Sequence, residues 1–148
     1  MTNYIGIHSA KVDDKGRMVI PSQFKNQTVT MDSPRFVVKR SFLSDCLDIY
    51  PYDEWEKEAD MIKSRLNFFR PEHIRFWREY MNDRAIIVPD EKLGRISIPK
   101  PLLESIGIRK EVVFFGVGFK IELWDKDRFE SSKLDDKTYT EIASQILF

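Results

Sequence analysis

The sequence predicts an α+β fold, mainly β with helices, in which two homologous units share one barrel. Three observations predict it. A stretch with a Gly-Arg turn occurs twice, short runs of alternating apolar residues surround each copy, and apolar residues at helical spacing follow the strands. The chain has 148 residues, of which 42% are hydrophobic and 32% charged, and this fits one ordinary domain or two small ones.

The internal repeat has two parts. Residues 16–24 align with residues 94–102 at an offset of 78, with Gly, Arg, Ile and Pro identical at four of the nine positions. Residues 47–50 align with residues 121–124 at an offset of 74, as a four-residue loop deletion would produce. We infer two homologous units, 1–70 and 71–148.

The first unit is expected to begin with a β-hairpin over residues 5–12 and 17–20, whose turn needs a positive φ at Gly16. Pro21 then begins a short helix, because proline suits the first helical turn. Two strands and a long helix follow, at 36–39, 47–50 and 53–69. Asp53 is the expected N-cap of that long helix.

The second unit is expected to open with a helix that begins at Pro71. Alternating apolar residues predict four strands, at 85–89, 95–98, 112–115 and 120–124. Helical spacing predicts three more helices, at 100–106, 126–132 and 136–147. Because four short strands per unit cannot bury two faces alone, we expect eight strands from both units to close one barrel.

Composition argues against several functional classes. The longest apolar run, 112–119, is too short for a membrane helix, and the N-terminus lacks the features of a secretory signal, so we expect a cytoplasmic protein with no membrane partner. One cysteine, Cys46, forms no intrachain disulfide, and two histidines, His8 and His73, leave no Cys/His zinc site. No serine or cysteine lies in a recognisable triad. We therefore expect no enzyme, no small-molecule substrate, no metal and no cofactor.

Charge is balanced overall but unevenly distributed. The 24 basic and 24 acidic residues cancel, yet residues 11–40 carry an excess of basic side chains and residues 45–60 an excess of acidic ones. A neutral protein with segregated charge can present a basic face to nucleic acid. Solvated helix faces explain much of the acidic stretch, so charge alone leaves a nucleic-acid partner open.

The Asp-x-x-Gly-Arg turn, the strand ending in Ile-Pro and the short helix after it resemble the swapped-hairpin barrel of bacterial AbrB-type DNA-binding proteins. Two such units in one chain resemble the MraZ family of transcriptional regulators, over residues 4–131. The resemblance implies two AbrB-like units interlocked in one swapped-hairpin, double-psi-like barrel. It also implies a nucleoid-associated protein that assembles into homo-oligomeric rings. Such rings bind short direct repeats of double-stranded promoter DNA, usually as a repressor of the division and cell-wall gene cluster.

The resemblance places the DNA-binding motif, Asp-x-x-x-Arg, in the hairpin loop of each unit. In the first loop the motif residues are Asp13, Lys15, Gly16 and Arg17. In the second loop the Asp position is Glu91, and the motif residues after it are Lys92, Gly94 and Arg95. Asp90, one residue earlier, is an alternative to Glu91.

The chemistry of these residues agrees with DNA binding. The planar fork of an arginine can bind a phosphate or the O6/N7 edge of guanine. Nearby lysines add attraction to phosphates regardless of sequence, and the candidates are Lys11, Lys15, Lys92 and Lys100. We expect Arg17 to contribute at least as much as Arg95, because its loop keeps the aspartate and a flanking lysine.

Two alternatives stay open at this point. Arg17 and Arg95 could serve only to pair with Asp13 and Glu91 across their turns. The same barrel also occurs in antitoxins, so the chain could be a protein-interaction module. In that case the tail at 135–148 would bind a partner protein, although it also fits a helix that docks on a neighbouring subunit.

Overall fold

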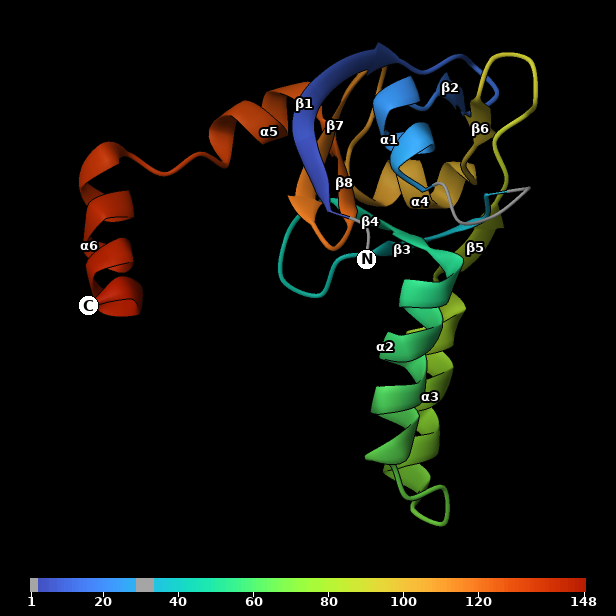
Figure 1. Cartoon of the computed structure of the whole chain (residues 1–148). Coiled ribbons are helices and arrows are strands. Elements are labelled where there is room, and N and C mark those ends of the chain that lie inside the picture. The colour runs from blue at the N-terminus through green and yellow to red at the C-terminus, as the bar shows by residue number, and fades with distance from the viewer. Residues whose placement is uncertain (1–2, 29–33) are drawn as a thin grey trace.

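The computed structural model describes residues 3–28 and 34–148. These residues form a mixed α+β fold with a six-stranded antiparallel sheet, a separate two-stranded ribbon and six helices (Figure 1). The strands are β1 (Tyr4–Lys11), β2 (Arg17–Val19), β3 (Phe36–Arg40), β4 (Leu47–Pro51), β5 (Arg84–Ile87), β6 (Arg95–Ser97), β7 (Glu111–Gly118) and β8 (Ile121–Asp125). The helices are α1 (Ser22–Gln27), α2 (Tyr52–Ser64), α3 (Pro71–Asn82), α4 (Lys100–Ser105), α5 (Lys126–Ser131) and α6 (Asp136–Leu147).

Each element expected from the sequence is present near its predicted position. The largest difference is α2, which ends at Ser64 rather than at residue 69. The chain there forms a compact loop in which the Asn67 N–H donates to His73 Nδ1 at 2.8 Å. The prediction of Asp53 as N-cap is wrong, because α2 begins at Tyr52 directly after Pro51, and Pro51 has no side chain that could accept a capping hydrogen bond.

Strand pairing joins the two halves of the sequence. The sheet order is β1-β7-β8-β4-β3-β5, and β2 pairs with β6 in the ribbon. Strands β1, β2 and β4 therefore each pair with a strand from the second half, and β3 pairs with β5. Neither half has a complete sheet of its own, so the halves are interlocked.

The pairing registers follow the repeat. In the ribbon, Met18 lies opposite Ile96, two residues that the offset of 78 also makes equivalent. In the sheet, Asp48 lies opposite Glu122, which the offset of 74 makes equivalent. Each pair of equivalent residues lies on a local two-fold axis, because the residues on either side of it pair reciprocally.

The coarse prediction of an α+β fold is confirmed, but a closed barrel is not. Within the described residues the edge strands β1 and β5 do not pair with each other, and the ribbon forms its own ladder. The ribbon strands β2 and β6 span three residues each. The ribbon instead covers the sheet with side chains, since Met18, Ile20, Ile96 and Ile98 belong to the same buried cluster as the sheet residues.

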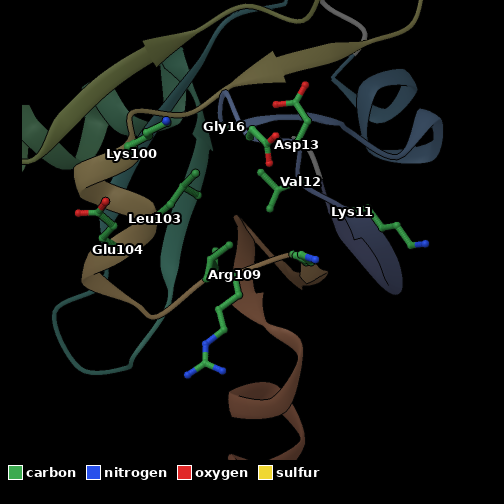
Figure 2. A pocket seen from close by; sticks show the side chains of 11 residues that line it. Lys11, Val12, Asp13, Gly16, Lys100, Leu103, Glu104 and Arg109 are labelled. Carbon is green, nitrogen blue, oxygen red and sulfur yellow. The ribbon is translucent and has the colours of Figure 1, made fainter.

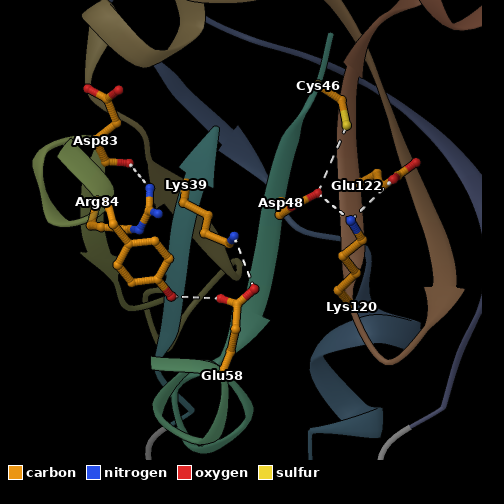
Figure 3. Close-up of polar contacts among 9 residues, drawn as sticks. Lys39, Cys46, Asp48, Glu58, Asp83, Arg84, Lys120 and Glu122 are labelled. Atoms are coloured by element: carbon orange, nitrogen blue, oxygen red, sulfur yellow. Dashed lines mark hydrogen bonds and ion pairs between the residues drawn. The ribbon is translucent and has the colours of Figure 1, made fainter. Parts of the chain in front are cut away.

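Helices α2 and α3 project from the body side by side, and α6 lies apart from it (Figure 1). The base of the α2–α3 hairpin is held by polar contacts (Figure 3). Buried Lys39 on β3 donates to Glu58 Oε1 at 3.3 Å, and the Tyr80 hydroxyl donates to Glu58 Oε2 at 2.9 Å. Burial lowers the pKa of Lys39 and raises the pKa of Tyr80. These contacts fix the hairpin on the side of the sheet away from the ribbon.

Candidate nucleic-acid interface

The two loop arginines lie on one exposed face of the β2–β6 ribbon. Side chains alternate along a strand, and Met18 and Ile96, at 2% and 1% exposure, point into the core. The residues on either side of them therefore point outward. These are Arg17, which lies opposite Ser97, and Val19, which lies opposite Arg95, so all four side chains lie on the same face. We call these four residues the ribbon face. The two arginines occupy diagonal positions, which in an antiparallel pair are about 7–8 Å apart.

Loop 1, residues 13–16, is organised by the carboxylate of Asp13. Its Oδ1 accepts the backbone N–H groups of Lys15 and Arg17, each at 2.9 Å. Its Oδ2 accepts Nε of Arg17 at 2.8 Å. The backbone closes the turn, since Gly16 N donates to the Asp13 carbonyl at 3.1 Å and Gly16 has a φ of 79°. One aspartate thus shapes the turn and orients the arginine.

Loop 2, residues 90–94, uses Asp90 in the same way. Its Oδ1 accepts the Leu93 N–H at 2.8 Å, and its Oδ2 accepts Nε of Arg95 at 3.2 Å. Glu91 is exposed and makes no side-chain hydrogen bond or ion pair within the described part of the chain. The geometry therefore assigns the aspartate position to Asp90 rather than to Glu91. Loop 2 has one residue more than loop 1, so its aspartate lies five positions before the arginine. The motif places the aspartate four positions before the arginine, and this spacing selects Glu91 instead.

Both arginines keep hydrogen-bonding capacity after this pairing. Each ion pair uses only Nε, and no terminal nitrogen of Arg17 or Arg95 is bonded to a described residue. The guanidinium side chains are 37% and 44% exposed. Backbone hydrogen bonds, together with the arginine charges, hold the pKa values of Asp13 and Asp90 below their usual value. Each aspartate is therefore ionised at neutral pH and holds its arginine with the outer edge of the fork facing solvent.

The predicted lysines lie around these loops. Lys15 and Lys92 are exposed within the loops, Lys11 ends β1, and Lys100 begins α4. None of the four forms an ion pair with another described residue. Lys11 and Lys100 also line a hollow of about 330 Å³ beside loop 1, with Gly16 and Asp13 at its edge (Figure 2).

Sequence reasoning missed Lys25 near loop 2. A methyl group added at Gly94 would lie 3.6 Å from Cδ and 3.8 Å from Nζ of Lys25, so this side chain runs along the loop backbone. Lys25 is in the first half of the chain and loop 2 in the second. No local motif joins them, although the interlocking implied by the repeat could have suggested the contact.

The polar cluster at the centre of the sheet is held together by ion pairs to one lysine. Lys120 Nζ lies 2.7 Å from Asp48 Oδ1 and 3.5 Å from Glu122 Oε2 (Figure 3). Cys46 is buried next to them, and burial raises the pKa of its thiol to about 12. Cys46 lies directly before β4, and its thiol is therefore protonated and unreactive. In the described ranges, no helix has the length and apolar character needed to cross a membrane.

Comparison with known proteins identifies relatives over nearly the whole chain. The family model described as "MraZ protein, putative antitoxin-like" matches residues 4–79 and 87–143. The chain is 35% identical to the transcriptional regulator MraZ of Bacteroides fragilis, over 99% of this chain and 92% of that protein. It is 34% identical to the protein of that name from Christiangramia forsetii, over 99% and 94%. For Pelotomaculum thermopropionicum the identity is 36%, over 97% and 95%. With matches that span both loops and nearly the full length of its relatives, the chain belongs to the MraZ family.

Proposed function

We propose that this protein is a sequence-specific DNA-binding transcriptional regulator. In this proposal it represses the division and cell-wall gene cluster by binding short direct repeats in the promoter, and it acts in the cytoplasm at the nucleoid. The observation that carries the proposal is the ribbon face, where two arginines related by a local two-fold axis present free guanidinium edges. The relatives named as transcriptional regulators support the same reading.

A two-stranded ribbon has the right size for this role, because the major groove of B-DNA admits such a ribbon. Arg17 and Arg95 would then bind O6 and N7 of guanine, or adjacent phosphates. Their aspartate partners fix the Nε edge, so less side-chain freedom is lost on binding. The turn-pairing alternative does not compete with this role, because pairing through Nε leaves the terminal nitrogens for DNA.

The proposal includes assembly into a homo-oligomeric ring. One ribbon face offers few contacts, so tight binding requires several linked chains on successive repeats. Helix α6 supports assembly, because it has no buried residue and its apolar side chains recur at helical spacing, at Tyr139, Ile142 and Ile146. A second copy of the chain would cover this face. We also propose 1–70 and 71–148 as the two repeat units of each protomer.

Native mass spectrometry tests the assembly separately from DNA binding. We expect an oligomer larger than a dimer for the full chain, and a smaller species after deletion of residues 135–148. A monomer at micromolar concentration would contradict the ring.

An antitoxin-like interaction module is the second candidate function. The family description contains the term antitoxin-like, and α6 has an exposed apolar face of the kind that binds partner helices. In this alternative α6 would bind a partner protein of different sequence. Salt-dependent, sequence-selective DNA binding by the isolated chain favours the regulator.

The deciding experiment is a gel shift with the DNA upstream of the protein's own gene and scrambled DNA as competitor. We expect the wild type to prefer its upstream DNA and the double variant Arg17→Ala/Arg95→Ala to lose that preference. The variant should keep the oligomer size and melting temperature of the wild type. If a folded, assembled double variant keeps its preference, the ribbon face is not the DNA-reading site.

A further inference from the structure

A groove beside loop 2 is lined by lysines and by no acidic residue among the described ones, and this basic lining is separate from the two arginines of the ribbon face. It has a volume of about 780 Å³ and is bordered by β1, α1 and loop 2. Its charged lining residues are Lys11, Lys25 and Lys92, with no aspartate or glutamate among the described residues that line it. We call it the lysine groove. Without a carboxylate to neutralise them, three cations around one concave surface attract an anion.

The neutral side chains of the lysine groove are also suited to an anion. Ser9, Ser22, Gln23 and Asn26 line it, and these residue types donate hydrogen bonds to phosphate oxygens in DNA complexes. His8 also lines the groove, and its Nε2 has no hydrogen-bond partner within residues 3–28 and 34–148.

The walls of the groove are fixed before any ligand arrives. Gln23 Nε2 donates to the Ile5 carbonyl at 3.1 Å, which ties α1 to β1. The His8 ring packs edge-on against Phe24 with centroids 5.0 Å apart, and Phe24 is fully buried. Lys25 follows Phe24 in α1 and runs along the backbone of Gly94. The cation is therefore placed by the packing of both halves of the chain.

The groove is continuous with the ribbon face. Val19 lines the groove and is also a residue of the ribbon face, where it lies opposite Arg95. A duplex with its major groove on the ribbon would bring a phosphate strand past this edge. Lysine contacts phosphate as a compact charge without reading the base sequence.

We propose that the lysine groove binds the phosphate backbone that flanks the bases read by the ribbon face, with Lys25 as its central cation. This inference rests on the proposed function and adds a binding surface to it. The equivalent hollow at loop 1 is a poorer phosphate site, because Asp13, Asp14 and Glu104 line it together with its basic residues.

The test is fluorescence anisotropy of the upstream duplex and of a scrambled duplex over a series of salt concentrations. We expect Lys25→Gln to weaken binding of both duplexes by the same factor. The slope of log affinity against log salt should decrease by about one for each protomer that engages the duplex. Lys25→Arg should keep the wild-type slope because it keeps the cation. Lys57→Gln is the matched control, since it removes an exposed lysine of α2, on the hairpin away from the ribbon.

The outcomes separate the two proposals. If wild type prefers its upstream duplex and Lys25→Gln keeps the wild-type salt slope, the groove inference is wrong and the proposed function stands. If wild type shows no preference for that duplex, the proposed function fails, and the groove inference with it. A parallel titration with inorganic phosphate distinguishes free anion from DNA. Phosphate binding that depends on Lys25, with an unchanged duplex slope in Lys25→Gln, would also overturn the assignment to DNA.

Discussion

Loop 1 and loop 2 come from the same repeat but lie in different surroundings. Each has an aspartate that holds an arginine by Nε, and each has a glycine with positive φ before that arginine. Loop 1 packs tightly on the backbone of Ile98 and also contacts α4, whereas loop 2 lies over α1 with more room. At an offset of 78, the residue under loop 1 is Leu103 and the residue under loop 2 is Lys25. The repeat thus keeps the arginine geometry, while one apolar-to-basic difference gives loop 2 a phosphate-attracting neighbour.

The largest expected difference between the loops is in stability. A methyl group at Gly16 would lie 2.6 Å from the Ile98 carbonyl oxygen, whereas one at Gly94 meets nothing closer than 3.6 Å. Both glycines have positive φ, which costs an alanine about 1–2 kcal/mol. We expect Gly94→Ala to lower the free energy of unfolding by about that amount and Gly16→Ala to lower it further. Urea denaturation measures both, and equal losses would contradict the tighter packing of loop 1.

The next expected effect is on DNA discrimination by the two arginines. The sequence predicts that Arg17 contributes at least as much as Arg95, because the first loop keeps the motif aspartate and a flanking lysine. Asp90 takes the role of that aspartate in loop 2, so we now expect Arg17→Ala and Arg95→Ala to lose similar discrimination, about 1–3 kcal/mol for each guanine contact. Competition gel shifts with upstream and scrambled DNA measure the loss. A several-fold stronger loss for one arginine would show that the local two-fold symmetry does not extend to the DNA complex.

A smaller effect is expected on the acid side of the stability profile. The folded protein holds the pKa values of Asp13 and Asp90 below their ordinary value. Such a group stabilises the fold above the ordinary aspartate pKa of about 4, and this contribution is lost as pH falls through the folded pKa. We expect Asp13→Asn/Asp90→Asn to lose less melting temperature than wild type between about pH 4 and pH 2. Asp14→Asn, which removes an exposed carboxylate of loop 1, is the control for a change in charge. If the double variant loses as much melting temperature as wild type over this pH range, the two aspartates do not make this contribution.

The smallest expected effect is that of the loop lysines. Lys15→Ala and Lys92→Ala each remove an exposed cation with no ion-pair partner in the described structure. Each should lower the salt slope of duplex binding by about one for each protomer that engages the duplex, equally for specific and scrambled DNA. A change in the ratio of specific to scrambled affinity would indicate that one of them contacts a base.

Local sequence signals predicted the elements well, because alternation, helical spacing, proline and glycine act within a few residues. The same signals gave a wrong residue in two places, the start of helix α2 and the aspartate of loop 2, where the outcome depends on backbone hydrogen bonds. Asp53 has the chemistry of an N-cap, but Pro51 takes the position at the end of β4. Glu91 has the spacing of the motif, but Asp90 has the side-chain length and position to reach both Leu93 and Arg95.

The sequence by itself determined the repeat, the order of strands and helices, and the two arginine loops. Only the tertiary structure decided that β1 pairs with β7 and β3 with β5, that the six-stranded sheet stays open, and that both arginines share the ribbon face. It also decided that Lys25 lies under loop 2 rather than in open solvent. The physical reason is that partner choice between strands and the neighbours of a loop depend on residues about 45 to 114 positions away. Local propensity contains no information on such contacts, and the burial of a common core selects them.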